Sequence, residues 1–535
     1  MDNVSLAGRL DAFAALLELN GSSFYTVRAY RRAAELIRST PADVDALVRA
    51  GRARELAGIG SGIEARLREL VETGELAELR ELEAEAMPEL VGVSRLLGLS
   101  PKRMRELGSA LGVRTLEGLR EAAAAGRLES VPGIGPKTAE RIRTGLEPTS
   151  APPRPQRGML LNRARALVGE IATALGGEPA GDPRRWCDLS TRFAVVVPSD
   201  TVLLGVESLP QVLAVLERGE RRVVCVTTEG HPVEIVAAAP ERLGTELVRA
   251  TGSAAYVTSL GELPEAATEE ELYALLGRPY RPPELRELDA ADPADDLLRL
   301  EDVRGDLHVH STASDGKATV LEMGLAARER GYEYLAICDH TKAVRVVEGL
   351  DAEGLRRQAE EIAAANEELA PFRVLRGSEC DILPDGSLDL PDDVLAELDW
   401  LQISLHAGQR WAREALTDRV VEAMHHPAAR CLSHPKGRIL NHRPENALDL
   451  DRVFEVALET GVALEINGLP DRLDLSAEHA RRALAAGVPI VCSTDAHSVR
   501  GLGNMALSVA TARRAGARRG QVLNTLPPTN VLARS

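Results

Sequence analysis

The segment DLHVH (306–310) decides the fold of the C-terminal third, because it is the first of seven short apolar runs that each read as a β-strand. The other six are YLAICDH (334–340), FRVLRGSE (372–379), WLQISLH (400–406), RCLSH (430–434), VALEIN (462–467) and PIVCSTDAH (489–497). Helix-like stretches rich in Ala, Glu and Arg separate them, and this alternation predicts a parallel sheet with right-handed crossovers. Seven such units predict a closed barrel with its functional site at the C-terminal ends of the strands.

Six of the seven runs end in His, Asp or Glu, the residue types that hold metal ions. His308 and His310 are two residues apart, as are Asp495 and His497, so on an extended chain each pair points to one face and can grip one ion. The single candidates are His340, Glu379, His406 and His434 at other strand ends, and Asp315 in the loop after the first pair. Nine candidates exceed what one tetrahedral zinc ion needs, so we predict two or three divalent ions suited to phosphoester hydrolysis.

The distribution of histidine supports this interpretation against a structural role. A single histidine at a strand end is more often a hydrogen-bonded structural residue than a ligand. Of the 11 histidines, however, only His231 precedes residue 300. We interpret His425, His426, His442 and His479, which fall in helix-like or loop segments, as surface or helix-end residues.

The motifs HVHSTASDG, ICDHT, GSE, ISLH, SHP and STDAH resemble those of the PHP (polymerase and histidinol phosphatase) superfamily. The resemblance implies a distorted (βα)7 barrel with a trinuclear metal site. The implied sets are His308, His310, Glu379 and Asp495 for one ion, Glu379, His406 and His434 for a second, and Asp315, His340 and His497 for a third. Imidazole and carboxylate ligands suit manganese, which we favour, as well as zinc and iron. Lys342, Lys436 and Arg438 follow ligand positions and could contact a substrate phosphate, or be solvated loop residues.

The composition limits the architecture. A chain of 535 residues is too long for one hydrophobic core and predicts about three to five domains. No apolar run reaches about 18 residues and the start of the chain is not signal-like, so we expect a cytoplasmic protein without a membrane partner. The six cysteines include no CxxC pair and read as reduced, buried thiols, which argues against a thiolate zinc site. No feature of the sequence indicates the oligomeric state.

Two segments near the N-terminus indicate local DNA binding, although the net charge of −17 argues against binding over the whole surface. LAGIGSGIEARLREL (56–70) and VPGIGPKTAERIRTGL (131–146) read as helix-hairpin-helix elements. Their glycines permit a tight turn, and the following helix offers N–H groups to a phosphate oxygen. The predicted DNA contacts are Gly58, Gly60, Gly62, Gly133, Gly135, Lys137 and Arg141, with added charge from Arg143. Such contacts reach the DNA backbone, so no sequence preference is expected.

The alternative for these segments is a helix pair that is joined by a glycine turn and binds no ligand. A weaker copy, LLGLSPKRMREL (96–107), departs from the pattern at Gly98-Leu99-Ser100, and we interpret it first as a packing element.

This layout resembles the bacterial X-family DNA polymerases, which combine helix-hairpin-helix, nucleotidyltransferase palm, thumb and PHP domains. SSFYTVRAYRRAAELI (22–37) and TEEELYALLGRPYRPPELREL (268–288) resemble the start of that family's N-terminal domain and its connection from thumb to PHP barrel. The implied fold is therefore multidomain, α and α/β. The expected domains are a helical helix-hairpin-helix domain (1–85), a fingers-like one (86–150), a degenerate α+β palm (151–245), a thumb-like region and linker (246–300) and a PHP domain (301–535).

The expected palm lacks the carboxylates that polymerisation needs. The family pattern Gly-Ser-x-Arg-Arg-Gly followed by Asp-x-Asp corresponds here to GDPRRWCDLSTRFAVVV (181–197), which puts Arg192 and Ala194 at the two aspartate positions. Asp188 replaces neither without shifting the alignment, and Glu234 alone could stand for the third carboxylate, too few to hold two magnesium ions. The lysine that relatives use for sugar-phosphate removal corresponds to Arg66, which stays protonated and cannot form an imine.

These features together predict a metal-dependent phosphoesterase that acts on DNA ends, with an inactive polymerase core. The expected reaction is that of a 3′-5′ exonuclease, or of a DNA 3′-phosphatase or abasic-site enzyme in repair. Two alternatives remain open: a small-molecule phosphatase of the histidinol-phosphate type, and a non-catalytic DNA-binding scaffold.

Overall fold

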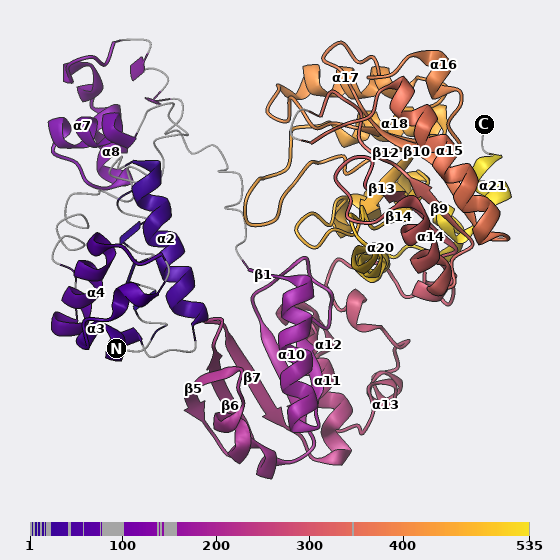
Figure 1. The fold of residues 1–535 in the computed structure, drawn as a ribbon. Coiled ribbons are helices and arrows are strands. Elements are labelled where there is room, and N and C mark those ends of the chain that lie inside the picture. The colour runs from indigo at the N-terminus through magenta and orange to yellow at the C-terminus, as the bar shows by residue number, and fades with distance from the viewer. Residues whose placement is uncertain are drawn as a thin grey trace. The chain divides into compact units, whose positions relative to one another are not determined.

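The structure is a computed structural model that divides into two compact units, Met1–Arg154 and Pro155–Ser535. It describes residues 158–344 and 347–533 continuously, and before them residues 23–40, 44–56, 58–74 and 101–135 with shorter pieces between and around these ranges (Figure 1). Within these residues, no helix combines the length and the apolar character that crossing a membrane requires.

The first unit is helical. Its described helices are α2 (Phe24–Ser39), α3 (Val44–Arg49), α4 (Ser61–Thr73), α7 (Pro101–Leu111) and α8 (Leu116–Ala124), with short 3-10 turns η1 (Ala53–Glu55) and η2 (Arg127–Ser130). Two separate apolar clusters stabilise it, one around α2 to α4 and one around α7 and α8. Each cluster contains one of the two predicted hairpins, through the buried side chains of Ile59 and Ile134.

The second unit begins with a five-stranded mixed sheet in the order β2-β4-β7-β6-β5. Its strands are β2 (Glu178–Gly181), β4 (Phe193–Val197), β5 (Val212–Arg218), β6 (Arg222–Thr227) and β7 (Pro232–Ala237), and β4 and β7 are the parallel pair. Helix α10 (Leu161–Leu175) places its apolar face on the sheet because its buried residues recur at helical spacing. Helix α11 (Leu243–Thr251) packs on β2 and β4 through Leu247 and Ala250. The domain boundary expected at residue 245 therefore falls inside α11, whose core contacts continue the sheet domain past that residue.

A small helical segment follows the sheet. Helices α12 (Ala254–Leu260) and α13 (Glu269–Leu275) pack together, and the Tyr256 and Tyr273 hydroxyl groups form a hydrogen bond of 2.7 Å between them. Tyr273 is fully buried in this cluster, and burial raises the pKa of its phenol. This segment leads directly into the C-terminal barrel.

All seven strands predicted in the C-terminal third are present and parallel, in chain order around one sheet. They are β8 (Gly305–Val309), β9 (Tyr334–Ile337), β10 (Arg373–Asp381), β11 (Trp400–Ser404), β12 (Cys431–Leu432), β13 (Ala463–Asn467) and β14 (Ile490–Ser493). A single parallel bridge between Val309 and Ala496 joins the first strand to the segment after the last one. The sheet is thus a nearly closed barrel, which confirms the predicted fold class.

Helices cover the outside of this barrel (Figure 1). They are α14 (Val320–Glu329), α15 (Ala352–Leu369), α16 (Asp392–Leu395), α17 (Arg413–Met424), α18 (Leu450–Thr460), α19 (Ala477–Ala486) and α20 (Met505–Ala515), followed by α21 (Pro528–Leu532). Six of the seven strands are buried along their whole length, as expected for a parallel sheet covered on both faces. The polar residues at the strand ends are therefore carried by buried strands.

Candidate metal centre

All nine predicted ligands lie at the C-terminal end of the barrel, in the last residues of strands or just after them. Eight of the nine residues form three groups, and the ligand atoms of each group all lie within 4.8 Å of one another. His434 belongs to none of the three groups. The groups are His310, Asp315, His340 and His497; His308, His310 and Asp495; and His340, Glu379 and His406. His434 approaches the third group, with its Nε2 2.9 Å from Glu379 Oε1. Because His310 and His340 are shared, the residues form one continuous cluster.

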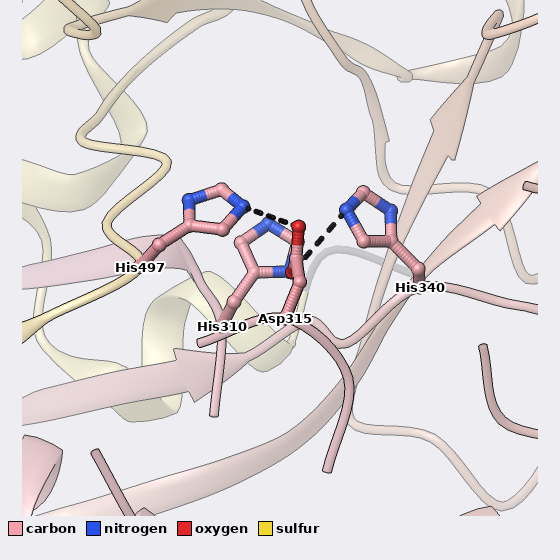
Figure 2. Close-up of side chains that lie close together, drawn as sticks. All are labelled: His310, Asp315, His340 and His497. Carbon is pink, nitrogen blue, oxygen red and sulfur yellow. Dashed lines mark ion pairs between the residues drawn. The ribbon is translucent and has the colours of Figure 1, made fainter. Parts of the chain in front are cut away.

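The loop residue Asp315 lies among three imidazoles, as Figure 2 shows. Its carboxylate is 3.2 Å from His497 Nε2 and 3.6 Å from His340 Nε2. Burial alone would raise the pKa of Asp315, but the hydrogen bonds to His340 and His497 outweigh it and the pKa is lowered. These four side chains come from a loop and three strand ends, so the tertiary fold assembles the group.

The pair Asp495 and His497 is not the extended pair that the spacing predicts. Strand β14 ends at Ser493, and Asp495 has a φ of +52°. His497 Nδ1 then forms a hydrogen bond of 2.8 Å with the Asp495 carbonyl. The two side chains consequently join different groups of the cluster, Asp495 with His308 and His497 with Asp315.

The carboxylate of Glu379 is the centre of the electrostatic interactions. It is almost fully buried and lies within 4 Å of five imidazoles, those of His308, His310, His340, His406 and His434. Burial alone would raise the pKa of Glu379, but His406, His340 and His308 lower it well below its usual range. Conversely, the carboxylates of Glu379 and Asp315 overcome the effect of burial on His340 and raise its pKa to about 10. Ionised carboxylates and cations thus stabilise each other here.

Several buried ligand atoms have no hydrogen-bond partner among the described residues, and this pattern fits a metal site. They are His308 Nε2, His310 Nδ1, His340 Nδ1, His434 Nδ1 and Glu379 Oε2. Glu379 Oε2 is 2.9 Å from His340 Nδ1, yet the two atoms lack hydrogen-bond geometry. A buried polar atom without a partner is destabilising, and a divalent cation would accept these lone pairs. Imidazole and carboxylate donors in this number fit more than one ion.

Glu465 is a functional residue that the sequence analysis missed. It is fully buried in the middle of β13. One carboxylate oxygen lies 2.7 Å from His308 Nδ1 and the other accepts a hydrogen bond of 2.7 Å from the His434 backbone N–H. The first contact leaves His308 Nε2 directed at the cluster, as carboxylates behind metal-bound histidines commonly do. The only signal in the sequence was a single carboxylate inside an apolar strand.

Further buried polar residues support the ligands from behind. Asp381 accepts a hydrogen bond from the His406 backbone N–H at 3.2 Å and lies 3.1 Å from His406 Nδ1. Asn467 donates to Asp495 at 2.9 Å. Asp339 accepts hydrogen bonds from the Ser311 backbone and hydroxyl and so orders the loop that carries Asp315. The ligand geometry is therefore fixed by a second layer of partners.

Lys436 and Arg438, two of the predicted phosphate contacts, have partners within the protein. Lys436 is buried, and its ammonium group donates to the carbonyls of Asn446 and Leu448 at 2.7 and 3.1 Å. Arg438 is also buried and donates to the Arg472 carbonyl at 2.9 Å. Protein groups thus engage both cations, and their contact with a substrate phosphate stays a prediction. Lys342, in contrast, is exposed and pairs with Asp351.

A different cation faces the cluster. Arg472 Nε lies 3.9 Å from Asp495 Oδ2, and its side chain keeps 19% exposure. It belongs to the loop after β13, 23 positions along the chain from Asp495, the nearest predicted ligand. No motif marked it, and only the fold brings it to the site.

In the five-stranded domain, Arg192 occupies one of the two expected aspartate positions. Its guanidinium donates to the carbonyls of Gly252, Ala250 and Arg249 at 2.7, 2.8 and 3.0 Å. These carbonyls belong to the C-terminal end of α11, where a cation is electrostatically favoured. Ala194, at the second position, is fully buried in β4. An internal cation thus lies where the family has metal-binding carboxylates.

The two remaining carboxylates of that region also have protein partners. Glu234 lies opposite Ala194 on β7 and pairs with Arg222. Asp188 pairs with two arginines of the barrel, Arg438 and Arg514. Both carboxylates therefore have arginine partners.

The hairpin residues are arranged as the motif predicts where they are described. Gly58 and Gly133 have φ of +110° and +79°, conformations that glycine adopts without strain. Gly60 precedes the first residue of α4, and Gly62 lies exposed in its first turn. Gly135 follows the second turn, and Lys137 and Arg141 lie outside the described residues. Arg66, at the expected lysine position, pairs with Glu69 at 3.2 Å.

Comparisons with known proteins agree with these features. Residues 1–76 match a family described as a helix-hairpin-helix domain, and residues 90–147 match a SAM-like helix-hairpin-helix tandem. A DNA polymerase/3'-5' exonuclease PolX of Bacillus subtilis is 32% identical over 96% of this chain and 96% of its own length. Probable phosphatases of Acetivibrio thermocellus and Syntrophotalea carbinolica are 30% and 27% identical over 36% and 41% of this chain, and over 78% and 90% of their own lengths.

Replacing Glu465 should weaken metal binding. In Glu465→Gln the His308 imidazole loses its anionic partner, and we expect affinity for a divalent ion to fall about 10–100-fold. Titration of metal-free protein with Mn²⁺ measures this change. Glu455→Gln removes an exposed glutamate of α18 and serves as the control. Equal affinities in the two variants would contradict the role given to Glu465.

Removing the metal should destabilise the protein. A bound ion at 100 times its dissociation constant stabilises the folded state by about 2.7 kcal/mol, so a chelator should lower the unfolding temperature. Differential scanning calorimetry with and without EDTA measures the shift. The double variant His308→Ala, Asp495→Ala removes two ligands of one of the three groups and should show a smaller shift. A wild-type protein whose unfolding temperature does not change with EDTA would argue against a metal site.

Proposed function

The chain belongs to the family of bacterial X-family DNA polymerases with a C-terminal PHP domain, and on this premise we propose that it is a metal-dependent 3′-5′ exonuclease acting on DNA ends. The related protein of Bacillus subtilis is named DNA polymerase/3'-5' exonuclease PolX, and it aligns with almost the whole chain. The observation that carries the proposal is the continuous cluster of eight ligand residues at the rim of the barrel, which His434 joins through its contact with Glu379. Such a cluster suits metal-assisted hydrolysis of a phosphoester.

Divalent ions at this site would supply an activated water and positive charge for the phosphate oxygens. The chain's own residues determine the geometry. The Glu379 carboxylate lies within 4 Å of five of the histidines and would be the carboxylate most central to the bound ions. Glu465 and Asp381 hold His308 and His406 in fixed orientations, so little reorganisation is needed when substrate binds. We favour manganese among the metals that this ligand set accommodates.

Arg472 is our candidate for contact with the scissile phosphate. Its guanidinium is the positive group beside Asp495 and is partly exposed, whereas Lys436 and Arg438 are engaged by protein carbonyls. A guanidinium can donate two parallel hydrogen bonds to a phosphate. It would add charge stabilisation and orientation at the rim.

The two hairpins are proposed to hold the DNA strand by its backbone. Glycine-rich turns before helix starts present N–H groups to phosphate oxygens without reading bases. The exonuclease proposal therefore includes binding that does not depend on sequence. This role is supported by the family matches over residues 1–76 and 90–147.

The polymerase core is proposed to be inactive. Arg192 is bound to three backbone carbonyls and Ala194 is apolar, so neither can hold a magnesium ion. Arg184 pairs with Glu269 at 2.6 Å, and Glu269 also pairs with buried Arg286. Arginines that would be needed to bind the phosphates of a nucleoside triphosphate are thus engaged in internal ion pairs.

A phosphomonoesterase activity is the second candidate. The relatives named as probable phosphatases align over 201 and 232 residues, close to the length of the barrel. The full-length protein should then release phosphate from a 3′-phosphorylated DNA end or from p-nitrophenyl phosphate. Turnover of the small ester alone, with unphosphorylated DNA left intact, would favour this function over the exonuclease.

The first test is a gel assay with a 5′-labelled primer on a gapped template and Mn²⁺. We expect the primer to shorten from its 3′ end. The double variant His308→Ala, Asp495→Ala should lose more activity than the ~10–100-fold typical for loss of one supporting residue. Shortening that persists in this variant would place the nuclease outside the barrel.

The same primer with all four deoxynucleotides and either Mg²⁺ or Mn²⁺ tests the polymerase core. We expect no extension, because one carboxylate does not hold two ions. The barrel double variant is the appropriate background, since it cannot remove added nucleotides. Any extended product would overturn the proposal of an inactive palm.

A further inference from the structure

Asp188 connects the five-stranded domain, which we call the palm-like domain from here on, to the rim of the barrel. Its carboxylate lies 2.6 Å from the Arg438 guanidinium and 2.9 Å from that of Arg514. All three side chains are at most 17% exposed. Burial alone would raise the pKa of Asp188, but Arg438 and Arg514 outweigh it and lower the pKa. The carboxylate is therefore an ionised partner of two buried cations.

Arg438 in turn joins two loops of the barrel rim. Its side chain donates to the carbonyls of Arg472 and Leu473. Its backbone N–H and that of Lys436 donate to the two carboxylate oxygens of Asp474, at 3.4 and 3.2 Å. The Arg438 guanidinium is consequently one of the contacts that hold the loop after β12 to the loop after β13, together with the Asp474 carboxylate and the hydrogen bond from the Leu440 N–H to the Asp471 carbonyl.

Both loops carry residues that face the metal centre. His434 begins the tight turn before Arg438, with a hydrogen bond of 2.9 Å from the Gly437 N–H to the His434 carbonyl. His434 has a φ of +26°, an unfavourable value for a residue with a side chain, so its neighbours must hold it there. On the other loop, Arg472 carries the guanidinium beside Asp495. The position of Arg438 thus affects a ligand and the proposed phosphate contact.

The surrounding interface makes this connection rigid. Leu161 of the palm-like domain packs with Leu473 and Leu507 of the barrel, and Trp186 lies against them. The Gly158 backbone N–H donates a hydrogen bond of 3.2 Å to Asn441 Oδ1, and the Asn441 side-chain amide donates one of 2.9 Å to the Gly158 carbonyl. The palm-like domain therefore meets the same rim loop at two places, Arg438 and Asn441.

We propose that Asp188 is a positioning residue for the metal centre, and that the palm-like domain, through the Asp188–Arg438 ion pair, holds the rim loops that carry His434 and Arg472. The inference rests on the proposed phosphoesterase site and gives the palm-like domain a function within it. Without the Asp188 charge, Arg438 keeps two side-chain anions nearby, Asp474 and Glu445, and the Glu445 carboxylate lies 3.9 Å from its guanidinium. A shift of Arg438 toward Glu445 would release the carbonyls of residues 472 and 473.

The test compares Asp188→Asn with Glu284→Gln. Glu284 also forms a largely buried ion pair with a barrel arginine, Arg513, at 2.8 Å. Arg513 and Arg514 are neighbours on α20, but Arg513 contacts neither rim loop in any described hydrogen bond. The two variants therefore remove equal charge from comparable interdomain ion pairs, and only one pair leads to the metal centre.

Binding of Mn²⁺ to the metal-free full chain is measured from the electron paramagnetic resonance signal of the free ion, together with thermal unfolding. We expect the affinity of the weakest Mn²⁺ site to be about tenfold lower in Asp188→Asn than in the wild type. This is the lower end of the loss of affinity that follows removal of a supporting residue. Glu284→Gln should bind like the wild type, while both variants unfold at lower temperature. Unchanged Mn²⁺ affinity in folded Asp188→Asn, or an equal loss in both variants, would overturn the proposal.

A second variant covers the case in which Asp188→Asn does not fold. Arg438→Lys keeps the charge but loses the planar group that reaches Asp188 and both carbonyls at once. We expect the same tenfold loss, and wild-type affinity would overturn the proposal. Failure of the proposed function is distinguishable, because a wild type that binds Mn²⁺ but does not shorten DNA leaves this comparison intact.

Discussion

The structure depends on the stabilisation of one buried carboxylate, that of Glu379. An isolated ionised carboxylate in a protein interior is strongly destabilising, and Glu379 is 1% exposed. Five imidazoles from other strand ends lie within 4 Å of it. Four other carboxylates in turn contact these imidazoles: Glu465 contacts His308, Asp381 contacts His406, Asp315 contacts His340 and Asp495 contacts His310. Each charge at the rim is thus tolerated only because the barrel brings its partner from another strand.

The palm-like domain satisfies its buried charges differently. Where the family has carboxylates that need metal ions, this chain has a guanidinium that needs only backbone carbonyls, and α11 provides three of them. Arg192 therefore stabilises the end of that helix without any ligand. The guanidinium at this position thus lets the domain keep its fold without a metal ion, which is consistent with the proposal that the polymerase core is inactive.

The strands and the nine ligand positions could be predicted from the sequence because both are local patterns. Apolar runs define strands, and side chains at the carboxyl ends of parallel strands meet at one rim. The direction of a long side chain is not local. Arg438 follows a ligand by four residues, yet its partner Asp188 lies 250 positions away along the chain. The role of Glu465 could not be predicted for a related reason, because it depends on which strands are neighbours in the barrel. The backbone turn at Asp495 could not be predicted because it depends on where β14 ends.

The interface between the palm-like domain and the barrel explains why an inactive palm would be retained. Removing it would expose Leu473 and Leu507 and leave Arg438 and Arg514 without their shared anion. Breaking a buried ion pair by removing one partner is more destabilising than never having had the pair, because an unpaired charge remains in the interior. Because Asp188 lies between two barrel arginines, the palm-like domain supplies an anion that these buried cations would otherwise lack.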